Sequence, residues 1–301
     1  MTYSSRKGLQ QVKIWIQASR PRTLTASVIP ILLGTTLSRF FVESIDWAIA
    51  ILTLICGVLI QIGINITNDA LDFQRGTDNE QRLGFKRVTY LGLLAPKHVL
   101  MGGFICFALA FLCGIPLILH GGWPFLVVLL SSIIFGYLYT GGPYPLAYYG
   151  LGDFFTLIFF GVICTTAPFY LQTGFIDFQS ILAGLQVGCL ATALIATNNL
   201  RDIENDEDSG KRTLAVFFGK TFARIEITIM TVIPLLLGSL WSNYGYPYAA
   251  WLPFFIVPLV IKNLISIWKE EPSRRFNIFF IRCALTHLLF GILLTLGFLI
   301  D

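Results

Sequence analysis

The stretch NITNDALDFQRGTD, residues 65–78, places acidic side chains at the end of a long apolar run. About twenty apolar residues precede it, which is enough for a helix to cross the hydrocarbon core of a bilayer. If the helix continues into the motif, Asn68 and Asp72 share one face, while Asp69 lies off that face. Amide and carboxylate oxygens so placed suit a hard divalent cation, above all Mg²⁺. Taken alone, acidic residues at a helix end are more often simply solvated.

A second motif follows another apolar run and repeats the spacing of the first. Residues 198–220 read NNLRDIENDEDSGKRTLAVFFGK, in which Asp202 and Asp206 are again four residues apart. Asn68 and Asp202 are separated by 134 residues, as are Asp72 and Asp206, which indicates two pseudo-repeated halves. Brought together, the two clusters would hold two or more Mg²⁺ ions around a diphosphate. Additional positive charge would come from Arg75, Lys211 and Arg212.

The composition indicates a membrane protein, because 55% of the residues are hydrophobic and only 13% are charged. We expect an all-α polytopic membrane protein with nine transmembrane helices, forming a single integral-membrane domain over residues 1–301. The acidic motifs occupy 68–78 and 198–213. The expected spans are about 23–40, 47–67, 98–119, 123–140, 153–172, 178–198, 225–242, 248–268 and 277–299.

The basic residues predict the orientation of these spans. All but one of the 21 Lys and Arg residues fall before the first span or near the loops that follow the second, sixth and eighth spans. Arg39 is the exception. With nine spans those segments lie on one side of the membrane, and the positive-inside rule puts the N-terminus and both motifs in the cytoplasm. The net charge of +4 is thus explained by topology, and nothing suggests nucleic acid.

Acidic clusters at the mouth of an apolar bundle suit the ionisation of an allylic diphosphate. Metal and basic residues would stabilise the departing diphosphate, while apolar walls hold the isoprenoid tail and exclude water. A nucleophile beside the resulting cation would then be alkylated. For this step the protein needs to position the nucleophile more than it needs a strong base. Transport is the alternative from another class. Transporter carboxylates often lie near the bilayer midplane, however, whereas these lie at span ends.

Two further segments carry candidate binding residues. RPRTL at 20–24 offers Arg20 and Arg22, either of which could bind an acceptor carboxylate or a diphosphate oxygen, with topogenic charge as the competing interpretation. Residues 136–153 read GYLYTGGPYPLAYYGLGD and are rich in glycine and tyrosine. These tyrosines would shield a carbocation with their aromatic faces or form an interfacial belt. They are Tyr137, Tyr139, Tyr144, Tyr148 and Tyr149.

The motifs resemble those of a known family. NDALD at 68–72 and DIEND at 202–206 are similar to the paired acidic motifs of the UbiA superfamily of intramembrane aromatic prenyltransferases. RPRTL, YTGGPYPLAYYGLGD at 139–153 and NNLRDIENDEDSGKRTLAV at 198–216 resemble the MenA branch more narrowly. Members of that branch prenylate 1,4-dihydroxy-2-naphthoate, and the nearest resemblance is to the cyanobacterial and plastid phytyltransferases of phylloquinone synthesis.

The resemblance implies a UbiA-like bundle, Mg²⁺ as cofactor and a set of site residues. Asn68, Asp72, Asp202 and Asp206 match the metal-diphosphate positions. Many members place a further acid four residues after the position of Asp72, where this chain has a glycine, and Asp78 is the candidate for that acid. The expected substrate-binding residues are Arg22, Arg75, Tyr139, Tyr149, Asn199, Lys211 and Arg212.

The reaction implied is transfer of a prenyl group, phytyl above all, from its diphosphate to 1,4-dihydroxy-2-naphthoate. The electron-rich ring would attack at its carboxyl-bearing carbon, and loss of CO₂ would restore aromaticity. The alternatives are polyprenyl transfer in menaquinone synthesis and another aromatic acceptor, such as 4-hydroxybenzoate or homogentisate. The protein would lie among the lipids of a plasma or thylakoid membrane.

Overall fold

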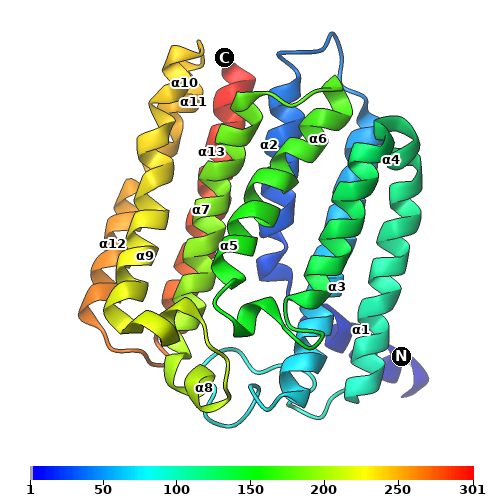
Figure 1. Ribbon diagram of the computed structural model, residues 1–301, viewed down its shortest axis with the longest axis vertical. Coiled ribbons are helices and arrows are strands. Elements are labelled where there is room, and N and C mark those ends of the chain that lie inside the picture. The colour runs from blue at the N-terminus through cyan, green and yellow to red at the C-terminus, as the bar shows by residue number, and fades with distance from the viewer. Residues whose placement is uncertain (1–2) are drawn as a thin grey trace.

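The computed structural model describes residues 3–301, with side chains from Gln10 onward. The two most N-terminal basic residues, Arg6 and Lys7, therefore have side chains outside the described part. Within residues 3–301 the chain forms helices and no strand, and seven helices are long and apolar enough to cross a membrane. In Figure 1 the long helices stand side by side in one bundle. The expectation of an all-α polytopic membrane protein is confirmed.

Some of the seven long helices are built from shorter elements joined end to end. They are α3 (Trp47–Gln74), α4 (Pro96–Leu138), the series α5 (Gly152–Thr156), η3 (Leu157–Ile163) and α6 (Cys164–Thr173), then α7 (Phe178–Arg201), α9 (Leu214–Gly238) with α10 (Leu240–Asn243), the series α11 (Pro247–Trp251), η4 (Leu252–Ile256) and α12 (Val257–Lys269), and α13 (Phe276–Ile300). The remaining elements are α1 (Tyr3–Ser19), η1 (Pro21–Thr23), α2 (Thr25–Ser38), η2 (Leu146–Tyr148) and α8 (Ile203–Asp208).

The nine expected spans and the seven long helices differ for two reasons. Helix α4 is a hairpin, because Gly122 has φ 71° and ψ −162°, values that only glycine adopts readily, and the chain turns back there (Figure 1). The two arms pack closely, since a Cβ on Gly114 would meet the side chain of Leu129. Helix α2 is apolar but has only 14 residues, too few to count as a long span. Counting both arms of α4 and α2, all nine expected segments are helical.

Helices approach each other closely at glycines, as they do between η3 and α7. A Cβ on Gly161 of η3 would lie 2.5 Å from the Cα of Gly188 on α7, and a Cβ on Gly188 would lie 2.7 Å from the carbonyl oxygen of Leu157. Helix association in a bilayer depends on such contacts, because lipid tails are as apolar as the helix surface. The η3 segment is π-helical, a form often found at functional sites.

Both acidic motifs lie at the same end of the bundle. Figure 1 shows the loop of residues 75–95, which joins α3 to α4, beside α8 at that end, with α1 nearby. The short segment between α12 and α13 is there too, whereas Arg39 lies at the other end, where its Nη1 is 3.4 Å from the carbonyl oxygen of Leu299. The basic segments are therefore gathered at the end that carries the acidic motifs, as the charge pattern predicts.

Candidate functional site

A cavity of about 230 Å³ lies inside the bundle, bordered by α2, α3, α4, the α5–η3–α6 series and α7. One part of its wall is polar and charged, and we call this the charged end. The residues of the charged end are Arg20, Asn65, Asn68, Asp72, Arg82, Arg87, Thr140, Asn198, Asn199 and Lys211. Most of the remaining wall is apolar and includes Ile31, Ile60, Leu129, Phe135, Phe155, Phe159 and Phe160.

Asn68 and Asp72 project from one face of α3 into the charged end, as their spacing predicts. Asn68 Oδ1 accepts a hydrogen bond from the hydroxyl of Thr140 at 2.7 Å. Asp72 Oδ1 accepts one from the hydroxyl of Tyr148 at 2.8 Å. Both acceptors are thus fixed by hydroxyls from the segment that follows α4, which limits the directions in which their oxygens can point.

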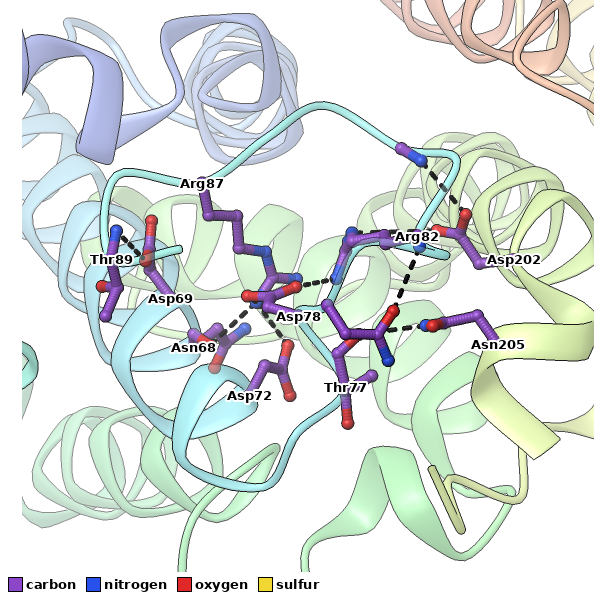
Figure 2. Close-up of polar contacts among 12 residues, drawn as sticks. Asn68, Asp69, Asp72, Thr77, Asp78, Arg82, Arg87, Thr89, Asp202 and Asn205 are labelled. Carbon is purple, nitrogen blue, oxygen red and sulfur yellow. Dashed lines mark hydrogen bonds and ion pairs between the residues drawn. The ribbon is translucent and has the colours of Figure 1, made fainter. Parts of the chain in front are cut away.

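Asp69 has a different role from its two neighbours in the motif. Its carboxylate accepts hydrogen bonds from the backbone N–H groups of Val88, at 3.2 Å, and Thr89, at 3.1 Å (Figure 2). Asp69 therefore ties the second half of loop 75–95 to the end of α3.

Two arginines of loop 75–95 neutralise the first motif, and sequence reasoning did not single them out. Arg87 Nη1 lies 2.5 Å from Asp72 Oδ2 and 3.0 Å from Asp78 Oδ2. Arg82 pairs with Asp78, and its Nε lies 4.0 Å from Asp202 Oδ2 (Figure 2). Burial alone would lower the pKa of Arg87, but the carboxylates of Asp78 and Asp72 outweigh it and raise that pKa. The carboxylates are thus matched by fixed positive charge.

In the second motif, Asp202 holds loop 75–95 in place. Its Oδ1 accepts hydrogen bonds from the backbone N–H groups of Leu83, at 3.2 Å, and Gly84, at 3.1 Å. Its Oδ2 lies 2.6 Å from Nη2 of the buried Arg201. Burial would raise the pKa of Asp202, but Arg201 and then Arg82 outweigh it and hold that pKa below the ordinary value. Asp202 therefore joins the end of α7 to the tip of the loop.

Asp206 and Lys211 form the other ion pair of the second motif, with Nζ 3.2 Å from Oδ2. Lys211 lines the cavity and Asp206 lies behind it. Burial raises the pKa of Asp206, and Lys211 opposes that rise. One residue earlier, Asn205 donates to the carbonyl oxygen of Thr77 at 3.0 Å, so α8 is bonded directly to the first motif (Figure 2).

The donor set suits Mg²⁺ bound together with a diphosphate. Among the described side chains, no three His, Cys, Asp or Glu residues converge on one metal position, because arginines stand between the carboxylates. Asn68 and Asp72 nevertheless present hard oxygens to the cavity, and the buried Oδ2 of Asp78 has the charge of Arg87 beside it but accepts no hydrogen bond from the described residues. Mg²⁺ is typically held by one or two carboxylates, with water and substrate phosphate completing its shell. These residues fit that mode of binding.

Three of the expected substrate-binding residues line the cavity, namely Tyr139, Asn199 and Lys211. Tyr139 lies where α4 ends, among the residues between the charged end and the apolar wall. The amide of Asn199 lies 3.4 Å from a carboxylate oxygen of the buried Asp153.

The other four lie outside the cavity. Arg22 is exposed, with its guanidinium carbon 5.2 Å from the ring centroid of Phe85. Arg75 donates to two backbone carbonyls in the segment that follows α4, at 3.2 and 2.6 Å. Tyr149 and Arg212 have exposed side chains, and their backbones form an isolated bridge. These four residues therefore contact the loops around the site and do not face the cavity.

Comparisons with known proteins agree with this geometry. The chain matches the UbiA prenyltransferase family over residues 27–289. A 1,4-dihydroxy-2-naphthoate octaprenyltransferase from Bacillus subtilis is 31% identical over 290 residues, covering 96% of this chain and 92% of that protein. A protein of the same name from Haemophilus influenzae is 31% identical over 306 residues, covering 97% of each chain.

A solved structure shows the same fold. A UbiA homolog from Archaeoglobus fulgidus, bound to DMAPP and Mg²⁺, superposes with a TM-score of 0.62 at 16% sequence identity and covers 93% of this chain and 98% of its own. The family match extends over most of the nine helical segments, and the resemblance to the UbiA superfamily is confirmed. This chain belongs to the UbiA prenyltransferase family, in its MenA branch.

Proposed function

We propose that this protein transfers a prenyl group from its diphosphate to 1,4-dihydroxy-2-naphthoate in an Mg²⁺-dependent, decarboxylating reaction. The observation that carries the proposal is a cavity with Asn68 and Asp72 at its charged end and mainly apolar walls elsewhere. Such a cavity suits a ligand with an anionic head and an isoprenoid tail. The names of the two relatives support the acceptor, and the ligands of the A. fulgidus homolog support the donor and the metal.

The charged end contains the groups that this chemistry needs. Mg²⁺ would be held by Asn68 and Asp72. The further acids would be Asp78, Asp202 and Asp206, which lie in ion pairs just behind the cavity lining. When bound, the metal supplies Lewis-acid stabilisation of the diphosphate leaving group. The basic side chains at the same end would bind its remaining oxygens through charge-assisted hydrogen bonds. They are Arg82, Arg87 and Lys211.

The walls of the cavity would control the fate of the allylic cation. Phe155 and Phe159 line it beside Tyr139, and they exclude water and offer aromatic faces to positive charge. The acceptor ring attacks through its carboxyl-bearing carbon, so a C–C bond forms there and the bond to the carboxylate breaks. CO₂ leaves, and its bonding electron pair restores the aromatic ring. No protein base is required, and the protein contributes mainly positioning.

We propose phytyl diphosphate as the natural donor, so that the product is demethylphylloquinol. On α3 the cavity lining runs from Asp72 to Thr53, which corresponds to about 28 Å at the usual rise per residue. An extended tail of four isoprene units fits within that length, whereas a tail of eight units exceeds it. Octaprenyl transfer, and hence menaquinone synthesis, is the alternative that the names of the relatives favour.

Competition between donors tests the proposal. Purified protein with Mg²⁺ and 1,4-dihydroxy-2-naphthoate would be offered phytyl, geranylgeranyl and octaprenyl diphosphates together, and the products identified by mass spectrometry. We expect a prenylated naphthoquinol that has lost its carboxyl group, with phytyl preferred. A preference for octaprenyl would overturn the donor assignment alone. Product from 4-hydroxybenzoate or homogentisate but not from the naphthoate would overturn the acceptor assignment.

We also propose that the charged end faces the cytoplasm, in a plasma or thylakoid membrane. The support is that the basic loops lie at the same end of the bundle as the acidic motifs (Figure 1). A cysteine introduced at the exposed Glu80 should resist a membrane-impermeant maleimide in intact cells and react after lysis. Labelling in intact cells would mean that the charged end faces the opposite side of the membrane.

A further inference from the structure

Arg20 differs from the other basic residues that line the cavity. Arg82, Arg87 and Lys211 each pair with a carboxylate. Arg20 lines the same charged end, but its Nη2 is buried without a hydrogen-bond acceptor, and it forms no ion pair within the described residues. Burying a charged donor is unfavourable unless an acceptor compensates for the lost water. Arg20 is therefore the basic residue of the charged end whose charge is not already balanced by a carboxylate of the described residues.

The backbone at Arg20 is held in a disfavoured conformation. Arg20 has φ 51° and ψ 67°, and it is the one non-glycine residue with positive φ in the part of the chain that the structure describes. A side chain with a Cβ rarely adopts this left-handed region. The buried Asn65 of α3 fixes the turn, because its Nδ2 donates to the Ser19 carbonyl at 2.9 Å and to the Thr23 hydroxyl at 3.0 Å. Strain that is held in place in this way is typical of functional positions.

The surroundings of Arg20 favour a bound anion. Burial and then the nearby Arg87 lower the pKa of Arg20 to about 9, while Asp69 opposes that shift. Asn65, which fixes this turn, precedes Asn68 on α3 by about 4.5 Å of helix rise, on the side away from Asp72. The turn that carries Arg20 is thus held beside the expected diphosphate position, on the side of Asn68 away from Asp72.

We propose that Arg20 binds the carboxylate of the aromatic acceptor, at an anion subsite separate from that of the diphosphate. This inference rests on the proposed function and adds the place where the acceptor binds. A guanidinium binds a planar carboxylate through two parallel N–H···O bonds, which would fix the plane and direction of the ring. In the proposed function Arg82, Arg87 and Lys211 bind the diphosphate, so the acceptor carboxylate is the anion left for Arg20.

The same contact would favour release of the product. When the new C–C bond forms at the ring carbon, the bond to the carboxylate breaks, its electron pair stays with the ring and CO₂ departs as a neutral molecule. The diphosphate leaves with the electron pair of its own bond to the prenyl carbon. The prenylated product therefore lacks the anion that Arg20 bound. Its affinity for the site should fall below that of the acceptor, which suits a product that must enter the lipid.

The test separates the two substrates by their KM values. In Arg20→Gln we expect the KM for the naphthoate to rise by roughly tenfold to a hundredfold, because a hydrogen-bonded charge pair is lost. The KM for the prenyl diphosphate and kcat should change little. Arg20→Lys keeps the charge without the paired geometry and should restore part of the affinity. Lys13→Gln, which changes an exposed charge on α1, is the matched control and should behave as the unaltered protein does.

A binding measurement without turnover keeps this inference distinct from the proposed function. The unaltered protein should be stabilised against heat by 1-hydroxy-2-naphthoate and less by 1-naphthol, which lacks the carboxylate. Arg20→Gln should lose this difference and Arg20→Lys should keep part of it, while both variants keep their stabilisation by Mg²⁺ with pyrophosphate. Loss of the pyrophosphate effect with the naphthoate effect intact would assign Arg20 to the diphosphate instead. Equal effects of the two naphthalenes on the unaltered protein would overturn the subsite, whether or not any donor gives product.

Discussion

At the scale of single residues, the charged end keeps its carboxylates paired with cations. Arg87 lies between Asp72 and Asp78, where it balances two buried negative charges. Leaving a buried charge without a partner is costly, so the pairing stabilises the fold around the site. It also makes the arginine a competitor for any metal ion that approaches the same oxygens.

Replacing an expected metal ligand should affect turnover much more than folding. Asp72→Asn keeps the shape of the side chain but removes its charge, and we expect kcat/KM for the donor to fall roughly a thousandfold, equivalent to several kcal/mol of metal-derived stabilisation. Asp208→Asn, at an exposed acid of α8, should stay within about twofold. Steady-state kinetics on folded, detergent-purified variants provides the measurement. Near-normal activity of Asp72→Asn would contradict the role of Asp72 as a metal ligand.

The competition between Arg87 and the metal can be measured directly. In Arg87→Gln the carboxylates of Asp72 and Asp78 lose their shared cation, so we expect Mn²⁺ to bind roughly tenfold more tightly in the absence of pyrophosphate. Binding would be followed by electron paramagnetic resonance of free Mn²⁺. Arg275→Gln removes an exposed charge near the start of α13 and serves as the control. An unchanged Mn²⁺ affinity in Arg87→Gln would show that the arginine does not occupy the metal position.

The sequence predicts some of these residues and not others, for a physical reason. Asn68 and Asp72 follow from helical spacing alone, because both positions belong to one continuous helix. Arg82 lies four residues after Asp78, which was the available signal for that pair, whereas no local spacing links Arg87 to Asp72. From the sequence alone, a loop arginine that belongs to the site cannot be distinguished from one that only sets the membrane topology.

At the scale of elements, loop 75–95 is fixed to three helices. Asp69 of α3 holds its second half, Asp202 at the end of α7 holds its tip, and Asn277 of α13 donates to the carbonyl oxygen of Leu83 at 3.0 Å. These bonds set the positions of the two arginines that face the cavity. The loop is thus part of the site, although its length and polarity in the sequence suggest only a connection.

The tip of this loop should not tolerate a side chain at Gly84. A Cβ there would lie 2.3 Å from Nη2 of the buried Arg201, so Gly84→Ala should displace the tip and weaken its bonds to Asp202. We expect faster tryptic cleavage after the exposed Lys86 and lower activity, with the bundle still folded. Glu80→Ala, at an exposed site in the same loop, is the control. Unchanged cleavage of Gly84→Ala would mean that the loop accommodates the methyl group.

At the scale of the whole molecule, the apolar runs predict the nine helical segments but not the cavity between them. Even the reversal within α4 falls near the expected gap between two spans, because Gly122 and the apolar arms are evident in the sequence. The lateral arrangement of helices depends on contacts such as the glycine approach between η3 and α7, which join residues distant along the chain. A cavity wall shared by several helices leaves no local pattern in the sequence.

The depth of the cavity should determine the preferred tail. Ala167 of α6 lines the cavity, so Ala167→Phe should shorten the space available. We expect the ratio of kcat/KM for geranyl over phytyl diphosphate to rise roughly tenfold or more, because the added ring blocks the longer tail. Ile115→Phe adds a ring at an exposed position of α4 and should leave the ratio unchanged. A constant ratio in Ala167→Phe would mean that the tail leaves the cavity by another route.

The most direct measurement is the yield of CO₂ from 1,4-dihydroxy-2-naphthoate labelled in its carboxyl group, set against the yield of prenylated product. It would be made on the purified protein with Mg²⁺ and phytyl diphosphate, and on Asp72→Asn under the same conditions. The account predicts one CO₂ for each prenylated naphthoquinol, with both signals lost when Mg²⁺ is chelated and in the variant. A product that retains the label, or equal turnover by Asp72→Asn, would contradict it.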